Sequence, residues 1–524
     1  MTADTIFYNG TLWTGRQGPN DATALAVGGD RIVAVGREID VVNLRGAATR
    51  VVDLEGGTLL PGFVDAHAHI WKIGHLLTTL LDVRSAASLT DLAARVRAHA
   101  DRLPPDAWLY GRGYNEARFS EGRGPTRHDL DAVIADRPVV LMRTCAHIIA
   151  CNSRALDLAG ITRDTPTPDG GEIVRGPDGE PTGVIAERAM GLVLRRMPAP
   201  TADEYAGMIA AALEHQLSRG ITSTNDAGVA PELLDTYLRL DAEHRLPARV
   251  NVMALRLVDG VGTVPLPPRR HATDRLRIDT VKFFADGGLS AAVAPLSVPY
   301  RHADTRGVLR MDEREFLALA HEAHDAGWRI ATHAIGDVAI DQVLRVYAAL
   351  GTAPMRHRIE HFGLPTEDQL ARAARRGVIA VPQTIFLHAL GRNFRQYLPE
   401  ALLARAYPIR AMLDAGLTVA LSSDAPVVEN DSPLAGIEAA LTRSDADGHQ
   451  IAADQAISLD EALDAYTRGG AVASGDEDLR GGLEAGLQAD LTVLSGNIRT
   501  TPTEAMTSLR VTQTWVGGRQ AYAG

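Results

Sequence analysis

Two hydrophobic patterns alternate through the central part of the chain. Short apolar runs rich in β-branched residues predict buried strands. Segments 89–100 and 202–219 have the spacing of apolar residues that is typical of helices. Strands that alternate with helices favour parallel βα units, and eight of them in one domain predict an α/β fold with a closed (β/α)₈ barrel. The eight runs are 58–64, 221–224, 249–253, 280–284, 329–333, 357–361, 378–381 and 418–422.

The two ends of the chain alternate and turn in a different way. Residues 5–8, 24–27, 31–35 and 51–54 are short strand-like runs, with Asn9-Gly10 as a turn signal. Runs 490–494 and 511–516 near the C-terminus have the same character. This predicts a small antiparallel sheet completed from both ends, so that residues 1–57 and 480–524 form one discontinuous β domain around a barrel of 58–479.

One section of the barrel does not fit the βα alternation. Residues 103–200, approximately, are rich in Gly, Pro, Asp and Arg, yet contain the strand-like run 138–142. We interpret this section as a long insertion after the first barrel strand. Near the end of the barrel, Ser458-Leu-Asp-Glu461 predicts a capping box that opens a helix.

Composition and charge narrow the class of partner. The chain has 524 residues, of which 45% are apolar and 23% charged, which is ordinary for a folded, soluble protein. No apolar stretch approaches the ~20 residues that cross a bilayer, and the N-terminus lacks the pattern of a signal peptide, so we expect a cytoplasmic protein. A formal net charge of −12 argues against nucleic acid or an anionic membrane as a partner and favours a small molecule.

A pair of histidines ends the first barrel strand. Strand periodicity places His67 and His69 on the same face, where two imidazoles can chelate zinc or a similar divalent ion. Hydrogen-bonded core histidines also produce such a pair, so residues further along the chain must decide between the two interpretations.

Polar residues end four of the later strands. Lys282, His333, His361 and Asp424 occupy these positions, and barrel active sites lie at the C-terminal ends of the strands. We therefore expect these residues to converge with the histidine pair on one rim. Imidazole and carboxylate suit a divalent ion that keeps a position open for water.

Lysine is an unusual neighbour for a metal, because an ammonium group repels the ion. Carboxylated by carbon dioxide, Lys282 would become an anionic carbamate able to bridge two ions; unmodified, it could pair with Asp286 or Asp424. Asp424 could take a proton from the attacking water and give it to the leaving nitrogen.

With these residues at or near the ends of its predicted strands, the sequence resembles the amidohydrolase superfamily. Within that superfamily it resembles the YtcJ-like metal-dependent hydrolases, the group that includes N-substituted formamide deformylase. The resemblance implies a distorted (β/α)₈ TIM-like barrel with a flanking β-sandwich, and hydrolysis of an amide, formamide or cyclic C–N bond by a metal-bound hydroxide. By position, His67, His69 and Asp424 would hold one zinc ion, His333 and His361 a second, and carboxylated Lys282 both. The motifs are Leu60-Pro-Gly-Phe-Val-Asp-Ala-His-Ala-His, Val281-Lys-Phe-Phe-Ala-Asp-Gly, Thr332-His-Ala-Ile-Gly-Asp, Ile359-Glu-His and Ser422-Ser-Asp.

Four further residues are candidates for the substrate side of the site. His147 and Asn152 follow a buried strand in the insertion and could bind a substrate carbonyl, although Asn152 could instead cap the next helix. Glu187 and Asp286 could orient neighbouring groups. The chain has Gly113-Tyr-Asn115 at a position where similar proteins commonly have Gly-Trp-Asp. This difference puts in doubt any substrate that is assigned to the chain from its resemblance to those proteins.

Two alternatives stay open. A deaminase with a single metal would use His67, His69, one later histidine and Asp424, with Lys282 unmodified; the presence of both His333 and His361 disfavours it. A non-catalytic binding scaffold is disfavoured because the ligand set is intact. The sequence leaves the substrate and the oligomeric state open, and the resemblance allows a homo-oligomer.

Overall fold

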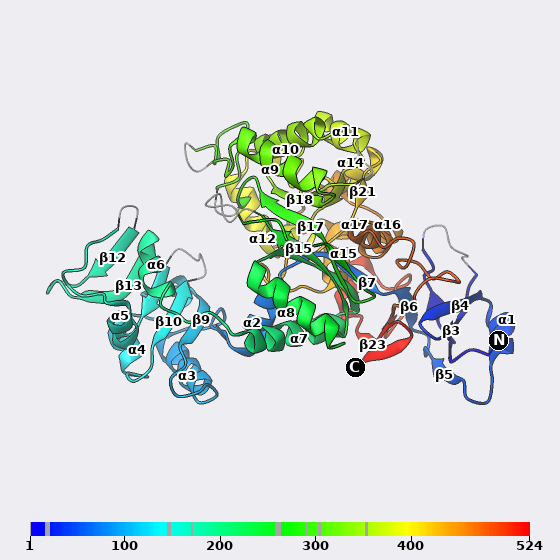
Figure 1. Cartoon of the computed structure of the whole chain (residues 1–524), viewed down its shortest axis with the longest axis horizontal. Helices are drawn as coiled ribbons and strands as arrows, with labels where there is room; N and C mark the ends of the chain where they lie inside the picture. Colours follow the sequence, from blue (N-terminus) through cyan, green and yellow to red (C-terminus); the bar gives the residue numbers. More distant parts are fainter. Residues whose placement is uncertain are drawn as a thin grey trace. The chain divides into compact units, whose positions relative to one another are not determined.

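The chain forms two compact units in the computed structural model (Figure 1). One unit comprises Met1–Ile70 and Ile209–Gly524, and the other comprises Trp71–Met208. The division falls within α2 (Ile70–Thr78) and α7 (Ala202–Ser218). The structure describes residues 2–15, 21–143, 148–168, 171–256, 264–267, 269–289, 292–301, 305–351 and 355–524.

Eight parallel strands form the largest sheet of the first unit. Their order is β21-β20-β19-β18-β17-β15-β14-β7, and the short β16 (His271–Ala272) pairs antiparallel with β17. The sheet agrees with the predicted barrel, since every predicted run overlaps one of its strands. The strands are β7 (Phe63–Ala68), β14 (Ile221–Val229), β15 (Arg249–Leu255), β17 (Leu276–Phe284), β18 (Arg329–Ala334), β19 (Arg358–His361), β20 (Ile379–Val381) and β21 (Thr418–Val419).

Backbone hydrogen bonds join the two edges of this sheet beyond the end of β21. The amide of Asp424 donates to the carbonyl of His67 at 2.8 Å, and the amide of His69 donates to the carbonyl of Ala425 at 2.8 Å. The first and last strands of the distorted barrel therefore meet where the predicted ligands lie.

The predicted first strand, 58–64, is two strands in the structure. β6 (Thr58–Pro61) belongs to a terminal sheet, and β7 starts after Gly62. A side chain at Gly62 would overlap the side chain of Thr222, because its Cβ would lie 2.2 Å from the Thr222 hydroxyl oxygen. The chain therefore changes sheets at a residue without a side chain.

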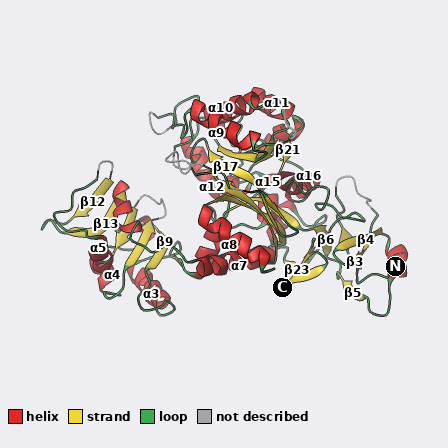
Figure 2. Ribbon diagram, in the orientation of Figure 1, coloured by secondary structure: helices red, strands yellow, loops and turns green. Residues whose placement is uncertain are grey.

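Helices cover the barrel sheet in the same unit (Figure 2). The predicted capping box is confirmed at Ser458 and Glu461, which open α16. No helix in the described ranges combines the length and the apolar character that a membrane span requires. The helices are α8 (Pro231–Ala242), α9 (Glu313–Asp325), α10 (Asp337–Ala349), α11 (Glu367–Arg375), α12 (Ile385–Tyr397), α13 (Glu400–Leu403), α14 (Ile409–Asp414), α15 (Pro433–Thr442), α16 (Leu459–Tyr466) and α17 (Arg468–Ser474).

Segments from both chain ends share one hydrophobic core. Phe7 contacts Trp515 edge to face, with ring centroids 5.1 Å apart, in a cluster that also contains residues of both terminal sheets. The pairs β1–β5 and β2–β6 are parallel, so the prediction of a purely antiparallel sheet was wrong. One sheet has the order β4-β3-β1-β5 (Arg31–Gly36, Ala24–Gly28, Thr5–Tyr8, Arg50–Asp53), and the other β2-β6-β22-β23-β24 (Thr11–Leu12, Thr58–Pro61, Leu491–Leu494, Val511–Val516, Arg519–Ala523).

The second unit has its own sheet and its own core. It begins at Trp71, earlier than the insertion expected from about residue 103, because α3 packs its Val96 in one cluster with Leu109 and Leu141 of this sheet. The sheet order is β12-β13-β11-β10-β9-β8 (Gly171–Arg175, Pro181–Glu187, Ile148–Cys151, Val139–Arg143, Leu109–Tyr114, Leu81–Asp82), and the helices are α3 (Leu89–Ala100), α4 (Arg127–Asp131), α5 (Ser153–Ala159) and α6 (Gly191–Leu194).

A buried ion pair links the barrel to the segment that enters β22. Arg249 donates from Nε to Oδ2 of Asp490 at 2.6 Å and from Nη2 to Oδ1 at 2.9 Å. Both side chains are almost fully buried. Burial raises the pKa of Asp490, but the charge and hydrogen bonds of Arg249, the charge of Arg480 and the amide of Gly517 together lower it by more, so the pKa lies below its ordinary value.

We expect Asp490→Asn to lower the free energy of unfolding by about 3–5 kcal/mol, because it removes the buried carboxylate that binds Nε and Nη2 of Arg249 and leaves only the half-exposed Asp274 to pair with this guanidinium. The lowered pKa means that the pair stabilises the fold fully above the ordinary pKa of an aspartate and less as the pH falls. Urea unfolding at neutral and acidic pH measures both effects. Glu313→Gln, which breaks the exposed pair with Arg345, should cost less than about 1 kcal/mol. Equal losses of unfolding free energy in Asp490→Asn and Glu313→Gln would contradict the conclusion that the buried Arg249–Asp490 pair stabilises the fold more than an exposed pair does.

Candidate metal centre

The six predicted ligand residues lie at the C-terminal ends of barrel strands or just beyond them. His67 lies in β7, Lys282 in β17, His333 in β18 and His361 in β19. His69 directly follows β7, and Asp424 follows β21. Parallel strands bring these ends to one rim, as the spacing predicts.

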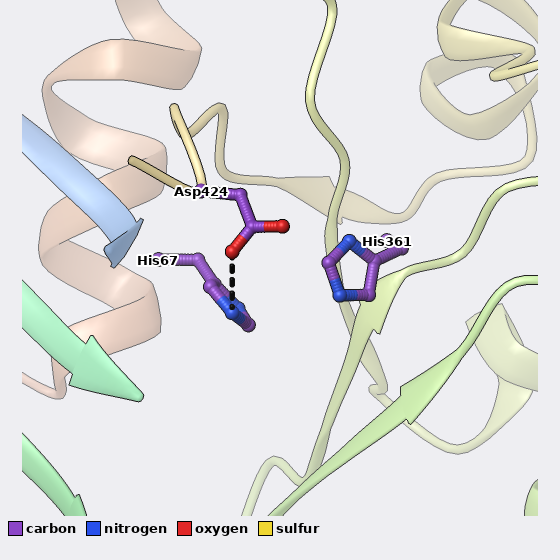
Figure 3. Close-up of side chains that lie close together, drawn as sticks. All are labelled: His67, His361 and Asp424. Atoms are coloured by element: carbon purple, nitrogen blue, oxygen red, sulfur yellow. Dashed lines mark ion pairs between the residues drawn. The ribbon is translucent and has the colours of Figure 1, made fainter. Parts of the chain in front are cut away.

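Three of these residues lie close enough to share one ion. His67, His361 and Asp424 each offer a ligand atom, and these atoms lie within 4.8 Å of one another. Figure 3 shows the Asp424 carboxylate directed toward His67, with the His361 ring facing them from another strand. Oδ1 of Asp424 lies 3.5 Å from Nε2 of His67 and 3.1 Å from Nε2 of His69.

The remaining two predicted ligands extend this group. The ring centroid of His333 lies 4.2 Å from that of His361. Lys282 is fully buried, with Nζ 5.1 Å from the ring centroid of Phe284, whose ring lies beside His333. Its charge contributes to lowering the pKa of His67, His333 and His361, which places the lysine in the same electrostatic environment.

Unusual backbone angles accompany two of the ligands. The backbone φ angle is +69° at His361 and +54° at Asp424, values that residues other than glycine rarely adopt. Such conformations cost about 1–3 kcal/mol each and are concentrated at functional sites. At the end of β19 the turn breaks the strand alternation, so that Glu360 and His361 both reach His67.

In three of the histidines, Nδ1 makes a hydrogen bond to an oxygen atom of a neighbouring residue. His69 bonds to the carbonyl of Ala227 at 2.8 Å, His361 to Oε1 of Gln383 at 2.6 Å, and His67 to Oε2 of Glu360. These oxygens accept a hydrogen from Nδ1, which leaves Nε2 with its lone pair for the site.

Glu360 and Gln383 were not among the predicted site residues. Both had a signal: Glu360 adjoins a predicted ligand in the Ile359-Glu-His361 motif, and Gln383 follows β20, the late barrel strand for which no candidate was named. Gln383 is oriented by its amide, which donates to the carbonyl of Val381 at 3.0 Å and to the Ser422 hydroxyl at 2.9 Å.

Burial sets the charge states of the ligands. It lowers the pKa of His333 and of His361 to about 3, and that of His67 well below its ordinary value, so all three are neutral near pH 7. Burial raises the pKa of Asp424, but the surrounding imidazoles of His69, His67 and His361 together lower it below its usual range. The donor set is therefore neutral imidazole and ionised carboxylate.

This donor set fits a divalent metal ion. Nitrogen and carboxylate oxygen are the ligands of catalytic zinc and similar ions. Within the described part of the chain, Nε2 of His333 is buried and makes no well-aligned hydrogen bond, although Oδ1 of Asp286 lies 3.2 Å away. A buried nitrogen without a hydrogen bond is expected where an ion normally binds.

The structure changes the interpretation of the substrate-side candidates in the second unit. His147 and the side chain of Glu187 lie outside the described residues. Asn152 is buried and caps α5: Oδ1 accepts from the amides of Ala155 and Val139, and Nδ2 donates to the carbonyls of Ile134 and Arg137. These four bonds saturate the amide, so the capping alternative holds and the prediction of a substrate contact is corrected.

Asp286 lies next to the metal ligands in the first unit. It is fully buried, accepts hydrogen bonds from the amides of Ile335 and Gly336, and has Oδ1 at 3.2 Å from Nε2 of His333. Burial raises its pKa to about 7. These contacts support a role in orienting the loop after β18.

Known proteins resemble the chain along nearly its whole length. The sequence profile of the amidohydrolase family matches residues 50–522. The chain is 30% identical to the putative amidohydrolase YtcJ of Bacillus subtilis (strain 168), with 94% of this chain and 96% of that protein aligned. It is also 30% identical to N-substituted formamide deformylase of Arthrobacter pascens, covering 99% and 98%. An uncharacterized metal-dependent hydrolase of Pyrococcus horikoshii superposes with a TM-score of 0.80 at 27% identity, covering 95% and 99%.

Removing a predicted ligand should weaken metal binding. We expect His361→Ala to lower zinc affinity by more than the ~10–100-fold that loss of an outer hydrogen-bond partner costs. Competition with a chromogenic chelator measures the affinity. The exposed His449, which groups with the buried Asp445 and the exposed Asp447, provides the control, and His449→Ala should leave the affinity unchanged. A larger loss in His449→Ala would place the metal elsewhere.

Proposed function

Because the chain belongs to the amidohydrolase family and is a hydrolase of carbon–nitrogen bonds, we propose that it hydrolyses an amide, formamide or cyclic C–N bond of a small molecule. The observation that carries this proposal is the convergence of His67, His361 and Asp424 within 4.8 Å. We propose zinc as the ion and two ions as the full complement. When bound, they supply activation of a water molecule and polarisation of the substrate carbonyl.

We assign the ligands by strand. His67, His69 and Asp424 would hold one ion, His333 and His361 the second, and carboxylated Lys282 both. Burial supports the modified lysine, since a buried ammonium beside metal ions is strongly disfavoured. Composition supports it as well: Lys72 and Lys282 are the only lysines among the 53 Lys and Arg residues. In a chain that carries its positive charges almost entirely on arginine, one of the two lysines occupies this buried position.

Asp424 would carry the proton. The carboxylate of Asp424 is ionised, which is the form that can accept a proton from the attacking water. The water oxygen bonds to the carbonyl carbon, the C–N bond breaks, and Asp424 returns the proton to the leaving nitrogen. The position of its Oδ1 beside both His67 and His69 supports this role.

The surroundings favour a neutral substrate with an apolar group. Phe386 stacks beside His361, with ring centroids 6.4 Å apart, and Phe284 lies 5.6 Å from His333. Together with the similarity to N-substituted formamide deformylase, these aromatic walls support N-formyl and N-acyl amines as the first substrates to test.

One observation favours a second candidate. The three residues whose ligand atoms gather within 4.8 Å form a site for one ion, which is what a single-metal deaminase would use. In that enzyme Lys282 would be unmodified, so the state of this lysine separates the two candidates.

Asp424→Asn should lower kcat on a genuine substrate by ~10²–10⁴-fold, because the amide cannot accept the proton of the attacking water. Steady-state kinetics on N-formyl amines, with the metal content measured on the same sample, checks this. Asp447→Asn, at a surface pair with Arg392, is the matched control and should retain full activity. Unchanged turnover in a metal-replete Asp424→Asn protein would contradict the proposed mechanism.

A carbamate on Lys282 can be seen directly. With ¹³C-bicarbonate and zinc, we expect the protein to give a carbamate carbon signal in its NMR spectrum that Lys282→Met lacks. Because the chain has one other lysine, Lys72→Met is a complete control and should retain the signal. A metal-loaded wild type without the signal would support the deaminase instead.

A further inference from the structure

A buried ion pair lies behind the metal centre, inside the barrel. On β19, Arg358 donates from Nε to Oε1 of Glu360 at 2.8 Å and from Nη2 to Oε2 at 3.0 Å. Both side chains are fully buried. Removing two charged groups from water costs free energy unless good geometry and further hydrogen bonds compensate for it. A buried ion pair beside the metal ligands is therefore better explained by a role in the site than by stability alone.

The arginine uses all of its hydrogen-bond donors. Nη1 donates to Oδ1 of Asn225 at 2.8 Å and to the carbonyl of Ala473 at 3.2 Å, and Nη2 donates to the carbonyl of Ala66 at 2.5 Å. Together with the two bonds to Glu360, these contacts engage each of the five N–H groups of a guanidinium. Arg358 is therefore fixed against β7, β14 and α17, and it fixes Glu360 in turn.

Glu360, which Arg358 fixes in place, in turn contacts the ring of His67. Its Oε2 contacts Nδ1 of His67, directly across from the Nε2 atom that lies 3.5 Å from Asp424. Both carboxylate oxygens of Glu360 accept a hydrogen bond from Arg358, so Glu360 is the acceptor in its contact with His67 and Nδ1 of His67 carries the hydrogen. Nε2 is then the atom with the free lone pair.

The contact to His67 differs in kind from those to two neighbouring histidines. His69 is held by the carbonyl of Ala227 and His361 by the amide oxygen of Gln383, both neutral groups. A carboxylate behind an imidazole fixes its tautomer and raises its strength as a ligand more than a neutral oxygen does.

We propose that Glu360 is a positioning residue for His67, and that Arg358 holds Glu360 in place as an immobile acceptor. The pair would hold His67 with the hydrogen on Nδ1 and with Nε2 aimed at the ion before any metal arrives. This inference rests on the proposed function in so far as His67 is a metal ligand.

The test needs variants that fold. Glu360→Gln alone would leave the Arg358 charge buried without a partner, so both members are changed together. Arg358→Met with Glu360→Leu removes the charges and the acceptor, whereas Arg358→Met with Glu360→Gln removes the charges but keeps an acceptor oxygen. The control is Arg249→Met with Asp490→Leu, which deletes another buried pair at a distance from the ligands.

Two measurements are made on each protein. Nitrogen NMR of ¹⁵N-histidine-labelled, metal-free protein reports the His67 tautomer, with His67→Gln assigning the signal. Competition with a chelator gives the zinc dissociation constant.

We expect the double variant with Arg358→Met and Glu360→Leu to lose the fixed Nδ1–H tautomer and to bind zinc ~10–100-fold more weakly. The double variant with Arg358→Met and Glu360→Gln should keep the tautomer with a smaller loss of affinity, and the control should match the wild type. An unchanged tautomer in the double variant with Glu360→Leu would overturn the proposal. If wild-type protein bound no metal, the proposed function would fail, and the tautomer measurement would still decide whether Glu360 positions His67.

Discussion

The metal centre depends on the closure of the barrel between its first and last strands. His67 and Asp424 are far apart in sequence, and they meet because backbone hydrogen bonds join β7 to the segment after β21. Asp65 reinforces this junction: Oδ1 accepts from the amides of His67 and Ser423, and Oδ2 accepts from the Ser423 hydroxyl at 2.6 Å. Burial raises the pKa of Asp65 to about 7. One buried carboxyl group therefore clamps the two segments that supply three of the proposed ligands.

Burial has a second consequence at the same place. It makes the histidines neutral, which a metal ligand requires, and it makes every polar group around them need a partner. The structure meets that need with groups that also orient the rings, namely Glu360, Gln383 and the carbonyl of Ala227. Stability and ligand geometry thus rest on the same hydrogen bonds.

The sequence predicted the barrel and the ligand positions because both follow from local patterns. An apolar run marks a strand, and parallel strands place their end residues on one rim, so His333, His361 and Asp424 could be grouped before any contact was known. Glu360 and Gln383 could not be given their roles, because these depend on which ring faces which oxygen across the barrel. The alternation rule fails at His361, where a positive φ turns two successive side chains toward His67.

Other departures from prediction also arise from tertiary contacts. The helix 89–100 was predicted correctly, but its place in the second unit is decided by the packing of Val96 on Leu109. Asn152 has the chemistry of a substrate ligand, and burial together with four backbone bonds makes it a helix cap. The parallel pairing of β1 with β5 depends on a crossover that strand patterns do not reveal.

We propose that these side chains hold metal for hydrolysis, with carboxylated Lys282 shared between two ions. The metal content of purified, zinc-supplemented protein, determined by plasma mass spectrometry in moles per chain, checks this proposal. We expect about two zinc ions per chain, as a bridged two-metal site requires. A folded protein that retains no metal after supplementation would refute the proposal.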